Sequence, residues 1–362
     1  MSAEWTRRRM LAALAGSAGA TLAGAVIAEE NGSAEGALES PQVGEPSADP
    51  TRQPGMPASE LGERSPFETL RRLPVAGVIS GTPLQDLHGM LTPSDLHFER
   101  HHAGIPKIDP ARHELLVHGM VERPLKFSLA DLLRFPAVTR TCFLECSGNF
   151  DYTAGPETTP QMLCGLISQS EWTGVALSTL LREAGLRPGA TWLLAEGSDA
   201  AVMTRSVPIE KAMDDAIVAY AQNGEAVRPA QGYPMRLLLP GWEGNTNIKW
   251  LRRIEVSDRP FMTREETAKY TEPILGQKAR SFSFTMDARS VITTPTYPQQ
   301  LEKGWNEIRG IAWSGRGQIA KVEVSSDGGK RWETARLFGP VLKTAHTRWT
   351  PLEVDGGRRG TA

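Results

Sequence analysis

The sequence contains little cysteine, no excess charge of either sign and no long apolar run. Three cysteines, Cys142, Cys146 and Cys164, are too few and odd in number for a disulfide framework, so at least one thiol is unpaired. A net charge of −2 gives no indication of a nucleic-acid-binding protein. No run of about 18 apolar residues predicts a membrane span, and no C-x-x-C-H motif predicts a covalently attached haem. These absences leave a chain of 362 residues that is long enough for two folded domains.

The N-terminal residues 1–28 have the pattern of a twin-arginine export signal. T-R-R-R-M-L at residues 6–11 precedes a weakly hydrophobic Ala/Gly stretch. Three glycines interrupt this stretch, which disfavours the alternative of an amphipathic helix at the start of a cytosolic protein. Residues 29–65 are rich in Pro, Gly, Ser and Glu and predict a disordered leader. We therefore expect a protein that is exported in folded form to the periplasm.

Residues 66–275 predict an α+β domain, because short helices occur among short strands without a regular βαβ alternation. One helix is expected to begin at Ser128 and end at Pro136, and another to cover 177–184 and end at Gly185. The expected strands are 113–121, 138–145, 191–195, 217–221, 235–239 and 253–256.

Residues 276–362 predict a β-sandwich. Apolar and polar residues alternate at 320–324, and Asp327-Gly328 is a hairpin signal. The region is about 85 residues long, whereas a seven-stranded sandwich needs about 100, and the final residues show little strand pattern. We therefore expect the last strands to be missing or weakly formed.

The stretch that organises the chemistry is R-T-C-F-L-E-C-S-G-N at residues 140–149. A cysteine at a strand end, ahead of a turn of small residues, can present a thiolate that binds a soft metal or attacks an electrophile. On this stretch alone both interpretations of Cys146 stay open. Cys142 lies four strand residues earlier, roughly 13 Å away, and cannot share a disulfide or a metal with it. Cys164 has apolar neighbours and is expected to be a buried small hydrophobe.

Two further stretches indicate anion binding. F-E-R-H-H-A-G-I-P at 98–106 places an arginine and two histidines side by side, where they fan outward and suit hydrogen bonding to an anion better than chelation. Q-G-Y-P-M-R-L-L-L-P-G-W-E-G-N-T-N-I-K-W-L at 231–251 combines Arg236 and Lys249 with glycines that let the backbone approach a ligand. It matches neither a P-loop nor G-x-G-x-x-G. An ordinary surface loop remains the alternative for each stretch.

Together, F-E-R-H-H, L-E-C-S-G-N, Q-G-Y-P-M-R, G-W-E-G-N-T-N-I-K-W-L and S-V-I-T-T-P resemble the sulfite oxidase family of molybdenum–molybdopterin enzymes. The resemblance covers about residues 66–340, and within the family it points to the molybdenum subunits of periplasmic sulfane dehydrogenases. It implies a mixed α+β molybdopterin domain over 66–275 and an immunoglobulin-like dimerisation domain over 276–362. It also implies Mo-molybdopterin as the cofactor.

The resemblance also implies roles for individual residues. Cys146 becomes the protein's molybdenum ligand, and the implied catalytic residues are Arg100, Tyr270 and Asp151. Sulfite-using members have an arginine where this chain has Asp151, and a carboxylate there should weaken the binding of a small free dianion. This favours sulfur that is presented on a partner protein's cysteine. The implied cofactor-binding residues are Phe98, Glu99, Arg100, His101, His102, Asp199, Gln231, Arg236, Asn247, Ile248 and Lys249.

We therefore expect the molybdenum subunit of a periplasmic sulfane dehydrogenase that oxidises sulfane sulfur bound to a carrier protein. Electrons would pass to a separate c-type cytochrome, since the sequence has no covalent haem motif. The expected assembly is a homodimer, or a heterotetramer with the cytochrome. A stand-alone sulfite dehydrogenase is the first alternative, and a non-catalytic exported β-rich interaction module is the second.

Overall fold

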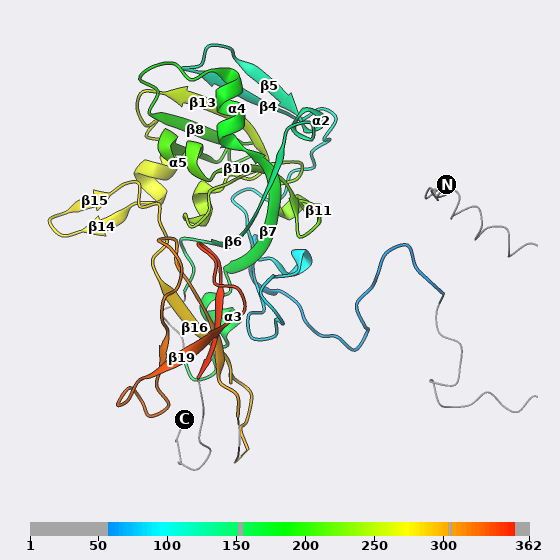
Figure 1. Cartoon of the computed structure of the whole chain (residues 1–362), viewed down its shortest axis with the longest axis vertical. Helices are drawn as coiled ribbons and strands as arrows, with labels where there is room; N and C mark the ends of the chain where they lie inside the picture. The colour runs from blue at the N-terminus through cyan, green and yellow to red at the C-terminus, as the bar shows by residue number, and fades with distance from the viewer. Residues whose placement is uncertain (1–56, 151–154, 303, 305, 352–362) are drawn as a thin grey trace, which may run out of the picture. The chain divides into compact units, whose positions relative to one another are not determined.

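The computed structural model describes residues 57–150, 155–302, 304 and 306–351 (Figure 1). The predicted export signal, most of the predicted leader, Asp151 and the last eleven residues, 352–362, lie outside the described residues. From Ser65 onward the described residues belong to one compact unit. Among the helices of the described part, none has the length and apolar character needed to cross a membrane.

Three sheets build the region that precedes residue 265. The first has the order β1-β2-β3, the second β11-β10-β7-β6 with β12 also paired to β10, and the third β5-β4-β13-β8-β9. Only the pairing of β4 with β13 is parallel among these strands. The strands are β1 Leu73–Ala76, β2 Ile79–Gly81, β3 Glu99–Arg100, β4 Glu114–Gly119, β5 Leu125–Ser128, β6 Ala137–Glu145, β7 Ile167–Ala176, β8 Trp192–Gly197, β9 Thr204–Pro208, β10 Ile217–Gln222, β11 Glu225–Ala226, β12 Arg236–Leu238 and β13 Leu251–Ser257.

The helices of this region are short and lie among the strands, which confirms the predicted α+β class. They are η2 Ser94–Leu96, α2 Leu129–Leu132, α3 Pro160–Cys164, α4 Leu177–Ala184, α5 Ile209–Asp214, η3 Pro229–Gln231, η4 Gly244–Thr246 and the π-helix η5 Glu265–Lys269. Two of the helix boundaries follow from local sequence. A capping box between Ser128 and Asp131 begins α2, and Gly185, with a φ of 74°, ends α4.

The main hydrophobic core lies between α4 and the strands around it. α4 buries Leu177, Leu180, Leu181 and Ala184, which share one helix face. These side chains pack with apolar residues of β4, β8, β12 and β13, including Leu115. This core fixes β12 and β13, and the loop between these two strands supplies one wall of the candidate site.

The chain then forms a hairpin and a further, five-stranded sheet. The hairpin consists of β14 Glu272–Ile274 and β15 Lys278–Arg280 and projects from the body of the compact unit (Figure 1). The sheet has the order β16-β17-β20-β19-β18. Its strands are β16 Arg289–Thr294, β17 Arg309–Trp313, β18 Glu323–Val324, β19 Glu333–Phe338 and β20 Thr347–Pro351.

The stretch with little strand pattern in the sequence contains one strand, β20. Residues 352–362 lie outside the described residues, so the expectation that the last strands are missing or weakly formed stays a prediction. Thr347–Pro351 pairs with both β17 and β19 and is therefore the middle strand of the sheet. Trp349 is 2% exposed and packs over Gly310, where an added Cβ would lie 2.3 Å from the indole ring. The proline and the polar residues around this strand obscured its alternation in the sequence. The hairpin signal at Asp327-Gly328 is confirmed, since β18 and β19 pair around it.

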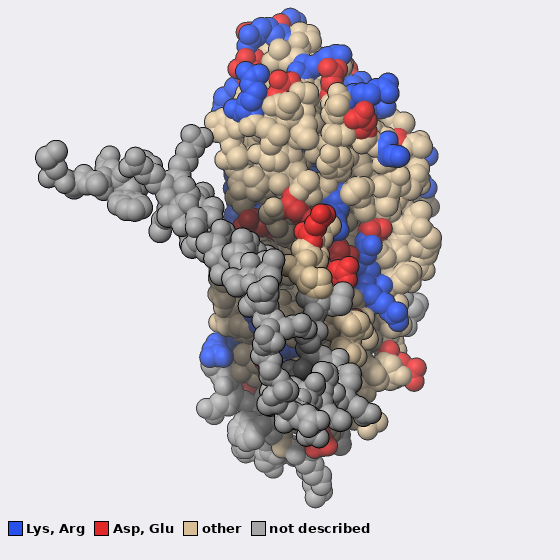
Figure 2. Space-filling view, turned by 90° about the vertical axis from the view of Figure 1, so that its right-hand side faces the viewer, with Lys and Arg blue, Asp and Glu red and all other residues tan. Residues whose placement is uncertain are grey.

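The charged side chains on one face of the molecule are mixed in sign. Figure 2 shows lysine and arginine beside aspartate and glutamate near its upper end, above a broad area of other residues. This distribution accords with a net charge of −2. The visible charges on this face therefore form no extended field of one sign.

Candidate active site

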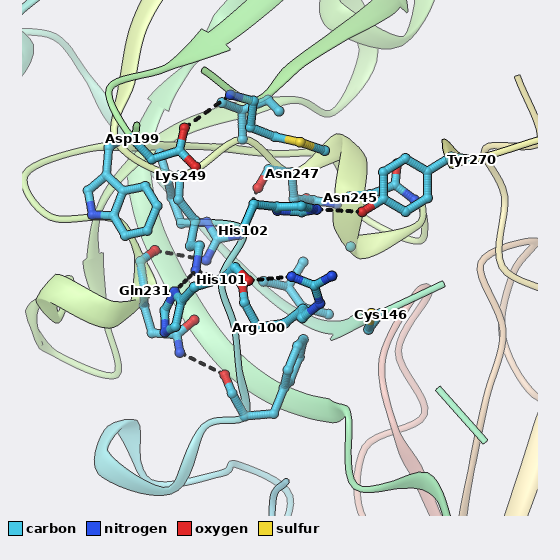
Figure 3. A pocket seen from close by; sticks show the side chains of 17 residues that line it. Arg100, His101, His102, Cys146, Asp199, Gln231, Asn245, Asn247, Lys249 and Tyr270 are labelled. Carbon is cyan, nitrogen blue, oxygen red and sulfur yellow. Dashed lines mark hydrogen bonds between the residues drawn. The ribbon is translucent and has the colours of Figure 1, made fainter. Parts of the chain in front are cut away.

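A single pocket brings together twelve of the residues that the resemblance singled out (Figure 3). They come from five segments far apart in the chain. These are the stretch from the end of η2 to the residues after β3, the end of β6, the turn after β8, the segment from η3 to β13 and the residue that follows η5. These residues are Phe98, Arg100, His101, His102, Cys146, Asp199, Gln231, Arg236, Asn247, Ile248, Lys249 and Tyr270. Glu99 does not line the pocket, and Asp151 lies outside the described residues.

Cys146 follows β6 directly and is held by its backbone. Its N–H donates to the carbonyl of Leu166 at 2.9 Å, and its own carbonyl accepts from the N–H of Asn149 at 3.0 Å. Burial raises the pKa of the Cys146 thiol, while a backbone hydrogen bond from Gly148 and the Arg100 guanidinium act in the opposite direction. A thiol with a raised pKa is a weak nucleophile, whereas metal coordination deprotonates it. The raised pKa therefore argues against a free nucleophilic thiolate, which leaves the metal-ligand interpretation of Cys146.

The donor set around Cys146 fits a metal that brings most of its ligands with it. In the part of the chain that the structure describes, no three His, Cys, Asp or Glu side chains are grouped as a metal site. A single thiolate cannot satisfy the coordination of a transition metal. The remaining ligands would have to come from an organic cofactor.

Lys249 supplies positive charge at the far end of the pocket (Figure 3). Its ammonium donates to the carbonyls of Arg100 and Ala230, both at 3.1 Å, and to Nδ1 of His101 at 2.8 Å. It also lies 4.6 Å from the ring centre of Trp250. All three hydrogen bonds end on neutral atoms, and burial, followed by the repulsion of nearby Arg236, lowers the pKa of Lys249 to about 7.

Arg236 is a second buried cation next to Lys249. It is 3% exposed and donates to the carbonyls of Gln231 at 2.9 Å and Asn247 at 3.1 Å. Its Nε has no hydrogen-bond partner among the described residues, and burial lowers its pKa to about 9. Two buried cations that bond mainly to neutral groups create a strong preference for an anionic ligand. The residues present therefore fit a phosphorylated cofactor such as molybdopterin.

Glu99 supports the pocket from behind. Its carboxylate pairs with Arg72 and lies 3.2 Å from Nε2 of His101. The hydrogen bond from His101, with that from Arg72, lowers the pKa of Glu99 to about 2 in spite of partial burial. Because His101 accepts from Lys249 at Nδ1, it donates to Glu99 at Nε2. Glu99 thus fixes the orientation of the His101 ring, which accepts a hydrogen bond from Lys249. The Glu99 side chain points away from the pocket, because successive residues of β3 point to opposite sides of the strand.

Tyr270 and His102 form a polar pair at the pocket wall (Figure 3). The Tyr270 hydroxyl lies 2.8 Å from Nε2 of His102. Burial and the nearby Cys146 raise the pKa of Tyr270 to about 12, while burial and Arg100 lower the pKa of His102. The tyrosine is therefore the donor and the neutral imidazole the acceptor. The guanidinium of buried Arg205 lies 5.4 Å from the ring centre of Tyr270 and holds it from the other side.

Five pocket residues were absent from the predicted site, and four of them carry a sequence signal. The five are Leu144, Met203, Gly244, Asn245 and Trp250. Leu144 stands two strand residues before Cys146 and so shares its face of β6, while three others lie in the 231–251 stretch. Met203 has no such signal, because it reaches the pocket through a turn in which Oδ1 of Asp199 accepts from its N–H at 3.0 Å.

Replacing Gly244 with alanine is expected to lower the cofactor content of the purified protein. An added Cβ would lie 2.6 Å from the carbonyl oxygen of Glu145 and 3.3 Å from Cα of Cys146, and both are backbone atoms that cannot move aside cheaply. Such overpacking typically costs about 1–3 kcal/mol. Metal analysis of the variant tests this, and Gly317→Ala serves as a control for a glycine with open space around it and no positive φ. Full occupancy in Gly244→Ala would show that the loop shifts without harm.

Comparisons with known proteins agree with this geometry. One family model, described as an oxidoreductase molybdopterin binding domain, matches residues 102–265, and a second, a Mo-co oxidoreductase dimerisation domain, matches 280–350. The chain is 43% identical to a chain in the crystal structure of the sulfane dehydrogenase SoxCD from Paracoccus pantotrophus. That match has a TM-score of 0.75 and covers 81% of this chain and 80% of the other.

Curated relatives lie in the same family. The chain is 30% identical to the sulfite oxidase of Gallus gallus over 313 residues, which are 80% of this chain and 65% of the relative. It is 31% identical to an NADH nitrate reductase of Ulva prolifera over 283 residues, 67% of this chain, and spans 32% of that relative's length. These matches confirm the fold class and the cofactor family. The chain belongs to the sulfite oxidase family of molybdopterin-dependent oxidoreductases.

Proposed function

We propose that this protein is the molybdenum subunit of a sulfane dehydrogenase that oxidises sulfane sulfur carried on a partner protein. The observation that carries the proposal is the 43% identity to the SoxCD chain over 81% of this sequence, against 30% to the sulfite oxidase of Gallus gallus. At 81% of this chain, the match is longer than either of the two matched domains.

The charges around Cys146 support a substrate other than a free dianion. The charged groups that act most strongly on its thiol are one cation, Arg100, and two carboxylates, Glu145 and Glu243. Burial raises the pKa of Glu243, and its carboxylate accepts from Asn245 at 2.6 Å beside the pocket. Glu145 is paired with Arg289 and does not line the pocket. Arg100 and Glu243 therefore offset each other beside Cys146, which leaves little net positive charge to attract sulfite. Sulfur bound to a protein cysteine carries less charge and is delivered by protein–protein contact.

Each pocket residue then has a role toward the cofactor or the substrate. Molybdopterin-held molybdenum, when bound, supplies oxygen-atom transfer and accepts two electrons. Cys146 would hold the metal, and Lys249 with Arg236 would neutralise the anionic part of the cofactor. The hydroxyl of Tyr270, kept protonated by its raised pKa, remains a hydrogen-bond donor near Cys146 across the physiological pH range.

The sequence motifs and the matched families support a proposed location and proposed partners. The twin-arginine pattern supports export to the periplasm, and the dimerisation-domain match supports a homodimer. The sequence has no C-x-x-C-H, so the acceptor would be a c-type cytochrome on a separate chain. A heterotetramer of two molybdenum subunits and two cytochromes satisfies both requirements.

Steady-state assays with a c-type cytochrome as acceptor test the substrate. We expect turnover with a purified carrier protein that bears a cysteine persulfide to exceed turnover with free sulfite by about tenfold or more, which corresponds to about 1.4 kcal/mol of discrimination. The unmodified carrier protein is the control. Fast oxidation of free sulfite without a carrier would support the sulfite dehydrogenase alternative instead. Nitrate reduction by a chemical electron donor would place the protein with its nitrate reductase relatives.

A further inference from the structure

Glu145, the residue immediately before Cys146, is a buried carboxylate with three hydrogen bonds. Its side chain is 0% exposed. Oε1 accepts from Nη1 of Arg289 at 2.7 Å and from Nδ2 of Asn149 at 2.9 Å, and Oε2 accepts from Nε1 of Trp313 at 2.7 Å. A carboxylate at such a position is costly to bury, and these three donors offset that cost. Glu145 is thus fully committed to structure and does not face the pocket.

Two of the three donors come from the C-terminal sheet. Arg289 begins β16 and Trp313 ends β17, and the two residues stand directly opposite each other in the antiparallel register. This cross-strand pair, hereafter called the rung, therefore directs both side chains at a single carboxylate. Glu145 lies 144 residues before Arg289 and 168 residues before Trp313. Phe150 adds a ring against Trp313 at 6.4 Å and lies under the Arg289 guanidinium at 4.7 Å.

The third donor ties the same carboxylate to the turn that carries Cys146. While Nδ2 of Asn149 donates to Glu145, Oδ1 of Asn149 accepts from the N–H of Leu166 at 2.9 Å. Leu166 in turn accepts from the Cys146 N–H, and the Asn149 N–H donates to the Cys146 carbonyl. The turn 146–149 is therefore held by hydrogen bonds at both of its ends, and Asn149 connects it to the Glu145 carboxylate.

A purely stabilising role explains this arrangement poorly. Buried ion pairs contribute little net stability compared with apolar residues of similar size, because desolvation cancels most of the attraction. What they supply is a defined geometry, since each donor restricts the carboxylate in a different direction. In this protein the restricted side chain belongs to the residue directly before Cys146, to which it is joined by one peptide bond.

We propose that Glu145 is a positioning residue through which the rung formed by Arg289 and Trp313 sets the orientation of the Cys146 thiolate. The C-terminal sheet then has a second task beside dimerisation, because it supports the metal site directly. This inference rests on the proposed role of Cys146 as the metal ligand. Residues that orient a metal ligand typically affect metal affinity or activity by about 10–100-fold.

Trp313→Phe is the sharpest test, with Trp349→Phe as its matched control. Both tryptophans are buried, and each donates one indole hydrogen bond, Trp313 to Glu145 and Trp349 to the Ser290 hydroxyl at 3.0 Å. We expect Trp313→Phe to change the Mo(V) EPR spectrum and to release molybdenum about tenfold faster on dialysis. Trp349→Phe is expected to keep the wild-type EPR spectrum and to retain molybdenum as the wild type does. This should hold even if its melting temperature falls by as much as that of Trp313→Phe.

Arg289→Met provides a second variant, with Arg316→Met as the control for an exposed ion pair, Arg316 to Asp287 at 2.8 Å. Hydrogen exchange of the peptide 144–149 in metal-free protein is measured alongside the EPR spectrum. Loss of a charged donor to the buried Glu145 carboxylate should accelerate that exchange by about tenfold or more. Arg316→Met should leave it unchanged.

The two readouts separate the inference from the proposed function. Faster exchange of the turn together with an altered EPR spectrum supports the positioning role. Unchanged exchange, or faster exchange with a wild-type spectrum and wild-type metal retention, overturns it while the proposed function stands. Wild-type protein that contains no molybdenum after expression in a molybdopterin-producing host refutes the proposed function first, and the positioning role with it.

Discussion

Cys146→Ser is expected to remove molybdenum from the protein and to reduce turnover by more than about 100-fold. Replacing a residue that merely orients a metal ligand already lowers metal affinity or activity by about 10–100-fold. Cys146 is the cysteine that lines the pocket, and its loss should cost more. Serine has nearly the same size, but a hydroxyl is a poor ligand for a soft metal site. The backbone hydrogen bonds that hold Cys146 remain in the variant. Its metal-free form should therefore unfold within about 1 kcal/mol of wild type.

Cys164→Ser is the matched control for this substitution. Cys164 is 1% exposed, packs in an apolar cluster with Phe143 and Trp313, and donates from Sγ to the Pro160 carbonyl at 3.4 Å. A serine there places a hydroxyl in an apolar environment and is expected to lower the free energy of unfolding by about 1–3 kcal/mol with molybdenum retained. Metal analysis and denaturant unfolding measure both quantities. Stoichiometric molybdenum in Cys146→Ser would contradict the ligand assignment.

Local signals accounted for part of the secondary structure, because the six strands expected before residue 276 correspond to strands of the structure, whereas β7 and β9 were not expected. The Ser128 cap, the Gly185 stop and the strand that leads into Cys146 depend on residues within a few positions of each other, and all three are present. β20 was missed because its strand character comes from its neighbours. Trp349 is buried only where Gly310, on another strand, leaves room for its ring.

In the candidate site, too, the features that depend on nearby residues were predicted, and those that depend on distant contacts were not. Residue types and their spacing, with the family resemblance, identified the segments that converge on the pocket. They did not show that Glu99 supports His101 from behind, because that depends on Arg72, a residue 27 positions earlier in the chain. Nor did they show the role of Glu145, whose donors Arg289 and Trp313 lie in the other domain. Contacts of this range follow from tertiary packing alone.

Lys249→Met is expected to have opposite effects on the cofactor-bound and the cofactor-free protein. In the bound protein the ammonium would pair with the anionic part of the cofactor, and removal of one partner of a buried charge pair typically costs about 2–5 kcal/mol. Cofactor retention should therefore fall by about thirtyfold or more. In the cofactor-free protein the hydrogen bonds of Lys249 end on neutral atoms, so methionine should raise the free energy of unfolding at pH 7.

Lys211→Met is the control, because Lys211 is a largely buried lysine with a carboxylate partner, Asp215, at 2.6 Å. Its removal leaves that carboxylate unpaired and should lower the free energy of unfolding by about 1–3 kcal/mol. Cofactor retention should stay at the wild-type level, since Lys211 does not line the pocket. Cofactor-free Lys249→Met that is less stable than wild type would show that the lysine serves the scaffold rather than the cofactor.

The pH dependence of the cofactor-free protein provides an independent check on Lys249. Its pKa is lowered from 10.5 to about 7 in the folded state, so between these values the unfolded chain binds more protons than the folded one. Stability should consequently rise with pH above about 7, by at most about 1.4 kcal/mol per pH unit. Denaturant unfolding between pH 7 and pH 9 measures this slope. The contribution of Lys249 to this rise in the free energy of unfolding with pH should be absent in Lys249→Met. It should also be absent in the cofactor-bound wild type, because an anionic partner keeps the lysine protonated in the folded state. An equal slope in all three proteins would mean that Lys249 is not the buried, unpaired cation that the cofactor requires.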